Sequence, residues 1–188
     1  MVILLIVIVA VLVIGVLYFI AKRNSIIASR NRVDESWSGI DVQLKRRHDL
    51  VPNLVETVKG YAEHEKQVFE KVTAARADAM SAQGVGDTAK AEEKLTGALT
   101  DLRAVAENYP NLRATENFQQ LSRNLSQLED EIQASRRIYN SNVQSYNTEI
   151  QQFPGSIIAN QGGFTAREYF EIEDATQREP VSVSFDKD

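Results

Sequence analysis

Apolar residues recur at helical spacing along most of this chain, and the clearest run lies in residues 112–153. From Phe118 onward they are separated by steps of three, four or seven residues, which keeps one face of a helix against a partner for about eleven turns. Ser135 occupies the one position left open, and no glycine or proline interrupts the stretch. The pattern predicts one long helix over residues 112–153, with these apolar positions: Phe118, Leu121, Leu125, Leu128, Ile132, Tyr139, Val143, Tyr146, Ile150 and Phe153.

A second apolar run with the same steps extends over residues 33–79. Pro52 removes a backbone donor and disfavours helix at the residue before it, and Asp49 is placed to cap a new helix. We therefore expect the first helix of the bundle to be kinked near Pro52, with a short break near His48 and Asp49. Both halves are expected to face the same core.

Two charged residues, Arg47 and Glu65, stand at positions of this second run where apolar residues are expected. A charge at a helix seam is costly unless it is paired, so two interpretations are open. We favour the one in which both side chains reach out from the edge of the bundle. The alternative is that they are paired within the seam and set the register of the helices.

The segment GVGD, residues 84–87, predicts a turn, and Asp87 or Thr88 can cap a following helix that ends near Tyr109 and Pro110. Short connections make sequential helices antiparallel neighbours. The predicted fold is therefore all-α: an N-terminal transmembrane helix, an elongated antiparallel bundle of three long helices, and a mostly irregular C-terminal tail. The corresponding divisions are residues 1–21, 22–153 and 154–188.

Residues 2–21 carry no charge and have the length that spans a hydrocarbon core as a helix. A cleaved signal peptide is the alternative, but no basic segment precedes the run and no small-residue cleavage site follows it. We therefore predict an uncleaved membrane anchor. Its lipid-facing positions include Val2, Leu5, Val9, Leu12, Gly15 and Phe19.

Basic residues cluster just after this span and are expected to face lipid headgroups. The positive-inside rule then places the bundle in the cytoplasm and the N-terminus outside. The first helix of the bundle either continues directly from the span, which gives a stiff tether, or follows a loop at Asn24 and Ser25. The headgroup-facing basic residues are Lys22, Arg23, Arg30 and Arg32.

After Pro154 the helical pattern ends. Residues 166–172 are expected to form a short helical turn, and Phe164, Tyr169 and Phe170 supply enough apolar surface to fold the tail back onto the end of the bundle. The last nine residues, PVSVSFDKD, alternate apolar and polar side chains. A short strand and a disordered tail are both open there.

The composition excludes several kinds of chemistry. The chain has no cysteine, so it has no thiol nucleophile, and its net charge of -5 argues against nucleic-acid binding. His48 and His64 lie outside any metal-ligand spacing and are interpreted as partly exposed surface residues. There is no phosphate-binding glycine loop and no G-x-S-x-G element. We predict no catalytic, cofactor-binding or metal-binding residue, and no enzymatic activity.

The outer face of the long helix is rich in amide side chains, Asn140 and Asn147 among them. Amides can form hydrogen bonds across a contact between bundles without burying charge. We therefore expect a higher homo-oligomer and take Gln127 and Gln144 as candidate positions on its contact face.

Two blocks of the chain carry a family resemblance: NRVDESWSGIDVQLKRRHDLVPNLVETVKGYAEHEKQVFEKVTAAR and YNSNVQSYNTEIQQFPGSIIA. Together with the N-terminal span they resemble the LemA family of bacterial membrane proteins, and residues 41–62 are the most specific part. The resemblance implies a single-span protein of the bacterial inner membrane with an antiparallel helical bundle. It also implies no established enzymatic activity, and similarity to a protein of magnetosome membranes.

Two hypotheses are consistent with these features. In the first, single-span protomers self-assemble through their bundles into a scaffold that organises or shapes the membrane. In the second, the chain is a membrane-tethered adaptor, and the end of its bundle or its tail, residues 155–188, binds and regulates another membrane protein such as a protease or transporter. The lipid membrane is the partner common to both.

Overall fold

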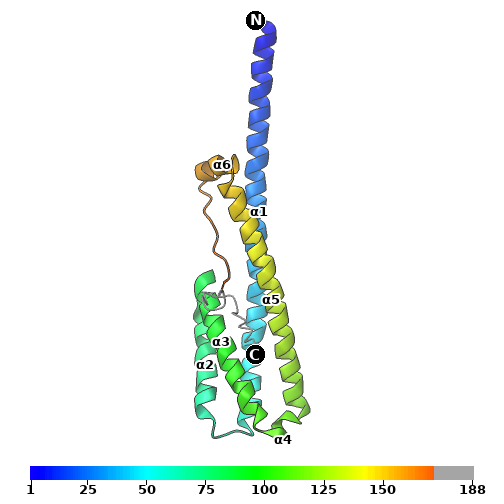
Figure 1. Cartoon of the computed structure of the whole chain (residues 1–188), viewed down its shortest axis with the longest axis vertical. Helices are drawn as coiled ribbons and strands as arrows, with labels where there is room; N and C mark the ends of the chain where they lie inside the picture. The colour runs from blue at the N-terminus through cyan, green and yellow to red at the C-terminus, as the bar shows by residue number, and fades with distance from the viewer. Residues whose placement is uncertain (172–188) are drawn as a thin grey trace, which may run out of the picture.

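The computed structural model describes residues 1–171, and in them every regular element is a helix (Figure 1). The predicted all-α architecture is confirmed. The remaining residues, 172–188, include the alternating segment at the C-terminus, so the predictions made for it lie outside the described residues. The helices are α1 (Val2–Lys59), α2 (Lys66–Ser81), α3 (Val85–Glu107), α4 (Pro110–Arg113), α5 (Glu116–Gln151) and α6 (Gly155–Gly162).

The axis of the molecule is α1, a single helix of 58 residues. At 1.5 Å per residue it is about 87 Å long. Its N-terminal third projects free of the rest, α5 runs antiparallel along the other two thirds, and α2 and α3 pack as a hairpin at the far end (Figure 1). The possible loop at Asn24 and Ser25 is absent, because α1 passes through these residues without interruption.

The predicted break near His48 and Asp49 is wrong, because α1 also continues through Pro52. Proline cannot donate to the carbonyl four residues earlier, which here is that of His48. In this structure Arg76 of α2 donates from Nε to that carbonyl oxygen at 2.7 Å. The acceptor that Pro52 leaves open is therefore satisfied by a neighbouring helix, and Asp49 is an ordinary helical residue rather than a cap.

The chain instead reverses at residues 60–65, a turn that the apolar pattern did not predict. Gly60 follows the last residue of α1, and the amides of Gly60 and Ala62 bond back to the carbonyls of Glu56 and Val58. The apolar steps run through this turn without a change of spacing, so the pattern predicted one element where there are two. The bundle consequently has four long helices, α1, α2, α3 and α5, instead of three.

The long helix α5 is shorter at both ends than predicted. Residues 110–113 form the separate helix α4, and Thr115 caps α5 by accepting a hydrogen bond at 3.4 Å from the amide of Phe118. At the other end, Phe153 lies beyond the helix and is 82% exposed. The last position of the apolar pattern therefore does not face the bundle.

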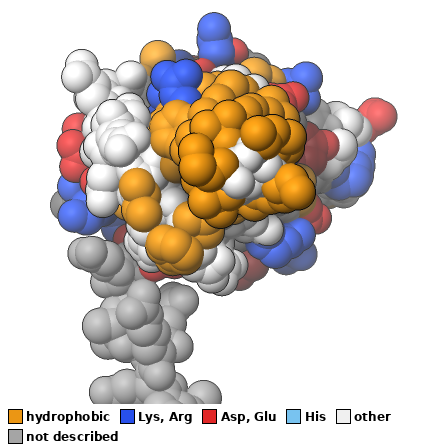
Figure 2. Space-filling model, turned by 90° about the horizontal axis from the view of Figure 1, so that it is seen from above, with side chains coloured by type: hydrophobic (Ala, Val, Ile, Leu, Met, Phe, Trp, Pro, Cys, Tyr) orange, Lys and Arg blue, Asp and Glu red, His pale blue; other side chains and the backbone are white. Residues whose placement is uncertain are grey.

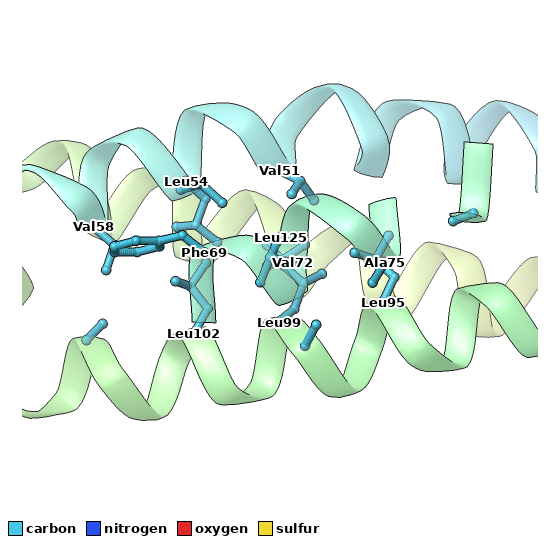
Figure 3. Packing of buried hydrophobic residues seen from close by; sticks show 14 of the residues in the cluster. Val51, Leu54, Val58, Phe69, Val72, Ala75, Leu95, Leu99, Leu102 and Leu125 are labelled. Carbon is cyan, nitrogen blue, oxygen red and sulfur yellow. The ribbon is translucent and has the colours of Figure 1, made fainter. Parts of the chain in front are cut away.

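Two hydrophobic cores lie one above the other along α1. The core at the far end brings together all four long helices, with residues such as Val51, Val72, Leu99 and Leu125 meeting between them (Figure 3). The core nearer the projecting part of α1 is formed mainly by α1 and α5. Here α6 and residues 164–171 take the place that α2 and α3 occupy at the far end.

Residues 164–171 form an extended segment, which we call the strap. The helical turn predicted for residues 166–172 is therefore wrong for the described part, and Ile172 lies outside it. The described part of the tail packs on the bundle, since Phe170 is buried and Phe164 is half-buried in the second core, whereas Tyr169 is exposed.

Candidate functional site

The projecting part of α1 is long and apolar enough to cross a membrane. All of its side chains are exposed, so nothing within the described protein covers them. Its length and composition match the hydrocarbon core of a bilayer, which is consistent with a membrane protein. The predicted lipid-facing positions all lie on this free stretch: Val2, Leu5, Val9, Leu12, Gly15 and Phe19.

Where this stretch ends, α5 is clamped to α1 through one carboxylate, that of Glu149. Its Oε1 accepts from Lys22 Nζ at 2.8 Å and from Ser25 Oγ at 2.6 Å, and its Oε2 accepts from Ser29 Oγ at 2.6 Å. Burial raises the pKa of Glu149, but the hydrogen bonds from Lys22, Ser25 and Ser29 outweigh this effect and hold it below its ordinary value. The carboxylate therefore stays ionised and ties the two helices together where the apolar stretch of α1 ends.

The four basic residues predicted to face headgroups are consequently not equivalent. Lys22 is half-buried and committed to Glu149, whereas Arg23 is exposed. Arg30 lies over the ring of Phe164 at 5.7 Å, and Arg32 donates to Ser29 at 2.9 Å. Among the described residues, Arg23 is the one of the four whose side chain makes no such contact.

A second polar site lies deep in the bundle around Arg47, which is only 2% exposed. Its guanidinium pairs with Glu92 of α3 and with Glu129 of α5, the latter at 2.8 Å, and also donates to Thr96 at 3.1 Å. His48 is buried as well and bonds Glu92 through Nε2 at 2.6 Å. We call these five residues the ionic cluster.

The ionic cluster corrects two predictions. Arg47 does not reach out from the edge of the bundle, and His48 is not a partly exposed surface residue. Glu65 is half-buried, and His64 is exposed as expected. The favoured interpretation of Arg47 failed because its partners, Glu92 and Glu129, are distant in sequence and belong to other helices. The alternative, a charge paired within the seam, is the arrangement found.

Chemically, the ionic cluster connects helices. Burial raises the pKa of Glu92, but the hydrogen bond from His48 and the charge and hydrogen bond of Arg47 together lower it below its ordinary value. Its carboxylate is thus held as an ionised acceptor between α1 and α3, and Glu129 extends the network to α5. Fixing three helices in one register is the role that this geometry supports.

Both carboxylates make stability depend on pH in a defined direction. Glu92 and Glu149 have folded-state pKa values below the ordinary 4.5, so their stabilisation is complete above pH 4.5 and is lost as the pH falls through the folded-state values. We expect the free energy of unfolding to drop below pH 4.5. In the double variant Glu92→Gln/Glu149→Gln, urea unfolding followed at several pH values should show a flatter acid limb than in wild type. An equally steep limb in the variant would contradict this assignment.

A third polar site holds the strap on α5. Asn147 accepts a hydrogen bond from the amide of Arg167 at 2.8 Å and donates one to the carbonyl of the same residue at 2.9 Å. Asn140 accepts from the amide of Phe170 at 2.9 Å and donates to the carbonyl of Phe170 at 3.2 Å. The hydroxyls of Tyr139 and Tyr146 donate to the carbonyls of Glu168 and Thr165, at 2.9 and 3.0 Å. All these bonds go to backbone atoms of the strap, so two Tyr-Asn pairs act as a clasp for an extended chain.

Sequence reasoning missed this clasp, although a signal was present. The dipeptide Tyr-Asn occurs at residues 139–140 and again at 146–147, one heptad apart. Both asparagines were assigned to an outer face available for contact between bundles, but Asn147 is buried and both asparagines bind the strap.

The two candidate oligomer positions, Gln127 and Gln144, are indeed exposed on α5. Gln127 donates to Glu131 of the same helix at 2.8 Å. The two residues do not share one stripe, because at 3.6 residues per turn they project about 100° apart around the helix axis. Ile138, also exposed, lies within about 20° of the direction of Gln127.

Within residues 1–171 no group of three or more His, Asp or Glu side chains is arranged to hold a metal ion. The polar sites described above bind parts of the chain itself.

Comparison with known proteins agrees with this architecture. The sequence profile of the LemA family matches residues 36–185. This chain belongs to the LemA family. The matched region begins on the part of α1 that lies past the apolar stretch, so the family is defined here by the bundle and its tail.

Two kinds of relative share this similarity. Protein LemA of Metamycoplasma hominis is 29% identical, over 79% of this chain and 69% of its own length. Magnetosome protein MamQ 2 of Paramagnetospirillum magneticum is 26% identical, over 87% of this chain and 71% of its own length. Magnetosome protein MamQ of Magnetospirillum gryphiswaldense is 23% identical, over 79% and 64%. None of these names refers to an enzymatic activity, and they fit a membrane-associated helical protein.

Proposed function

We propose that this chain is a non-enzymatic, single-span scaffold of the bacterial inner membrane, whose copies associate through the flanks of their bundles to organise or shape the membrane. The observation that carries the proposal is the continuity of α1. One uninterrupted helix forms both the apolar span and the first helix of the bundle, from Val2 to Lys59. Because no loop intervenes, the direction of the bundle follows that of the span, as a scaffold that imposes geometry on a membrane requires.

The clamp at Glu149 and the ionic cluster support the same proposal. The clamp joins α5 to α1 where the span ends, and the cluster fixes α1, α3 and α5 about 25 residues further along α1. A body held at two levels resists bending between them. The relatives named as magnetosome proteins favour a role in membrane organisation.

Self-assembly is tested by placing a charge on each flank. In the scaffold, Gln127→Lys and Gln144→Lys should each bring like charges together at a contact between copies and lower the particle mass towards that of a monomer. Light scattering of the full-length protein in detergent measures this mass. Gln83→Lys, an exposed glutamine in the connection between α2 and α3, is the matched control and should leave the mass unchanged. A wild-type protein that is already monomeric would contradict self-assembly.

The adaptor is the second candidate, and the direct continuity of the strap with residues 172–188 favours it. Ending the chain after Glu171 keeps the clasp and removes only residues 172–188. The adaptor then loses its partner in affinity capture while assembly persists, whereas the scaffold keeps its function.

The side of the membrane on which the bundle lies is tested by protease treatment of intact spheroplasts. If the bundle is cytoplasmic, as proposed, the membrane protects a C-terminal tag from protease added outside. Digestion of the tag would mean that the orientation is the reverse.

A further inference from the structure

The short helix α6 lies where the membrane span ends. A side chain added at Gly155, the first residue of α6, would meet the carbonyl oxygen of Glu149 and would lie 3.3 Å from Cε of Lys22. Lys22 is the first charged residue after the apolar stretch of α1. The backbone of α6 is therefore packed against the boundary residue of the span itself, at the same level along α1 (Figure 1).

The surface that α6 and the preceding turn present at this level is uncharged and carries two exposed hydrophobic side chains beside the amides of Gln152, Asn160 and Gln161. Ile158 and Ala159 are buried in the second core, so they hold α6 in place. On the opposite side Ile157 is 51% exposed, and Phe153, just before the helix, is 82% exposed. Seen end-on from the N-terminus, hydrophobic side chains lie beside the span on this end of the molecule (Figure 2).

The segment that contains α6 carries no charged side chain of its own. Residues 150–166 contain no Asp, Glu, Lys or Arg, although these residues make up 25% of the whole chain. If this segment were surrounded by water, the absence of charged side chains would give it no added stability. At the interface of a bilayer it avoids the cost of moving charged groups out of water, and aromatic and branched apolar side chains are favoured there.

We propose that α6 and the turn before it form a second membrane contact, in which Phe153 and Ile157 enter the boundary between headgroups and acyl chains of the leaflet where the span ends. This inference rests on the membrane anchoring contained in the proposed function. The occupant of the surface is the same bilayer that α1 crosses, because α6 packs against Lys22, where the apolar stretch of α1 ends. Interfacial apolar faces typically reach about 5–10 Å into this boundary.

A second contact would change what the span can do. A single helix leaves the bundle free to tilt in any direction relative to the membrane. With α6 embedded on one side of α1, one face of the bundle is held towards the membrane. Copies that associate would then do so from a defined orientation.

The absence of cysteine makes a direct test possible, since any introduced cysteine is a unique labelling site. We would prepare the full-length variants Phe153→Cys and Ile157→Cys with an environment-sensitive nitrobenzoxadiazole label, in nanodiscs of phosphatidylcholine and phosphatidylglycerol. Val42→Cys is the matched aqueous control. It replaces an exposed valine of α1, 20 residues past Lys22 and therefore about 30 Å further along the helix from the end of the span. Val9→Cys, within the span, is the lipid control.

We expect lipids carrying a nitroxide near the headgroup to quench the labels at residues 153 and 157 at least severalfold more than the label at residue 42. Aqueous iodide should give the opposite order. If labels at 153 and 157 behave like the one at 42 while the label at 9 is shielded from iodide, the α6 contact is refuted and the anchor stands. If the label at 9 also stays in water, the anchor itself is refuted, and this inference with it. Circular dichroism of each labelled variant verifies that the bundle is folded.

Discussion

Replacing Arg47 with methionine is expected to lower the free energy of unfolding by about 3–5 kcal/mol. The change removes the cation that compensates Glu92 and Glu129, and it leaves the buried Glu92 carboxylate with only His48 as a partner. Removing one member of a buried ion pair has a cost of this size, because the remaining charge stays in a poorly solvated place. Urea unfolding of the full-length protein in detergent, followed by circular dichroism, measures the change.

The control for this prediction is an exposed ion pair in the same bundle. Lys71 of α2 binds Asp101 of α3 at 2.6 Å, and both side chains are about half exposed. Solvent-exposed pairs contribute less than about 1 kcal/mol, so Lys71→Met should have little effect. A loss for Arg47→Met as small as that for Lys71→Met would show that the ionic cluster does not hold the bundle together.

A double-mutant cycle separates the pair from its surroundings. If Arg47 and Glu92 act mainly on each other, the double variant Arg47→Met/Glu92→Gln should lose less free energy of unfolding than the sum of the two single variants. The reason is that Glu92→Gln removes the buried charge that Arg47→Met leaves unpaired. Additive losses would mean that each residue is stabilised chiefly by other groups.

Replacing Phe170 with alanine is expected to detach the strap. Phe170 is 2% exposed, lies 5.7 Å from the ring of Trp37 and has the guanidinium of Arg136 over its face at 5.0 Å. Removing a buried aromatic side chain typically costs about 3–5 kcal/mol. Since the strap can open without unfolding the bundle, the loss should appear locally, as amide exchange at Arg167 and residue 170 that is more than about a hundredfold faster. Hydrogen exchange measured by mass spectrometry or NMR detects it.

The neighbouring residue is the matched control. Tyr169 is an aromatic residue of the same strap, but it is exposed, so Tyr169→Ala should leave amide exchange in the strap nearly unchanged. Amides of the far core, around Leu99, should keep their protection in both variants. Equal acceleration in the two strap variants would mean that the clasp, and not the burial of Phe170, determines how often the strap opens.

The features that could be predicted from the sequence were local or periodic. The apolar span and the pairing faces of α1 and α5 follow from the kind of residue at each step, and both predictions match the structure. The reversal at residues 60–65 was hidden because Val58, Tyr61 and Val68 keep helical spacing across it. The spacing of apolar residues indicates which of them face a core. It does not indicate whether the chain reverses direction between them.

The polar sites were missed for a different reason, since each depends on partners far away in sequence. Arg47 looks like an interruption of its own helix until Glu92 and Glu129 are placed beside it. Pro52 looks like a helix breaker until Arg76 reaches the carbonyl of His48. The amides of Asn140 and Asn147 are polar surface groups on an isolated helix, and only the returning strap gives them their ligands.

The spacing of the two Tyr-Asn pairs also determines the number of strap residues between the two bound sites. Seven residues of α5 advance about 10.5 Å along its axis, and three residues of extended chain cover about 10 Å, so the two spacings coincide. Asn147 and Asn140 accordingly meet Arg167 and Phe170, three residues apart, while Tyr146 and Tyr139 meet Thr165 and Glu168, also three apart. Because the clasp forms hydrogen bonds only to backbone atoms, side chains at the exposed strap positions are free to vary. A single residue inserted or deleted between the two bound sites would instead prevent both Tyr-Asn pairs from binding the strap at once. The strap is therefore constrained in length, and its sequence is constrained at Phe170, whose side chain is buried in the second core.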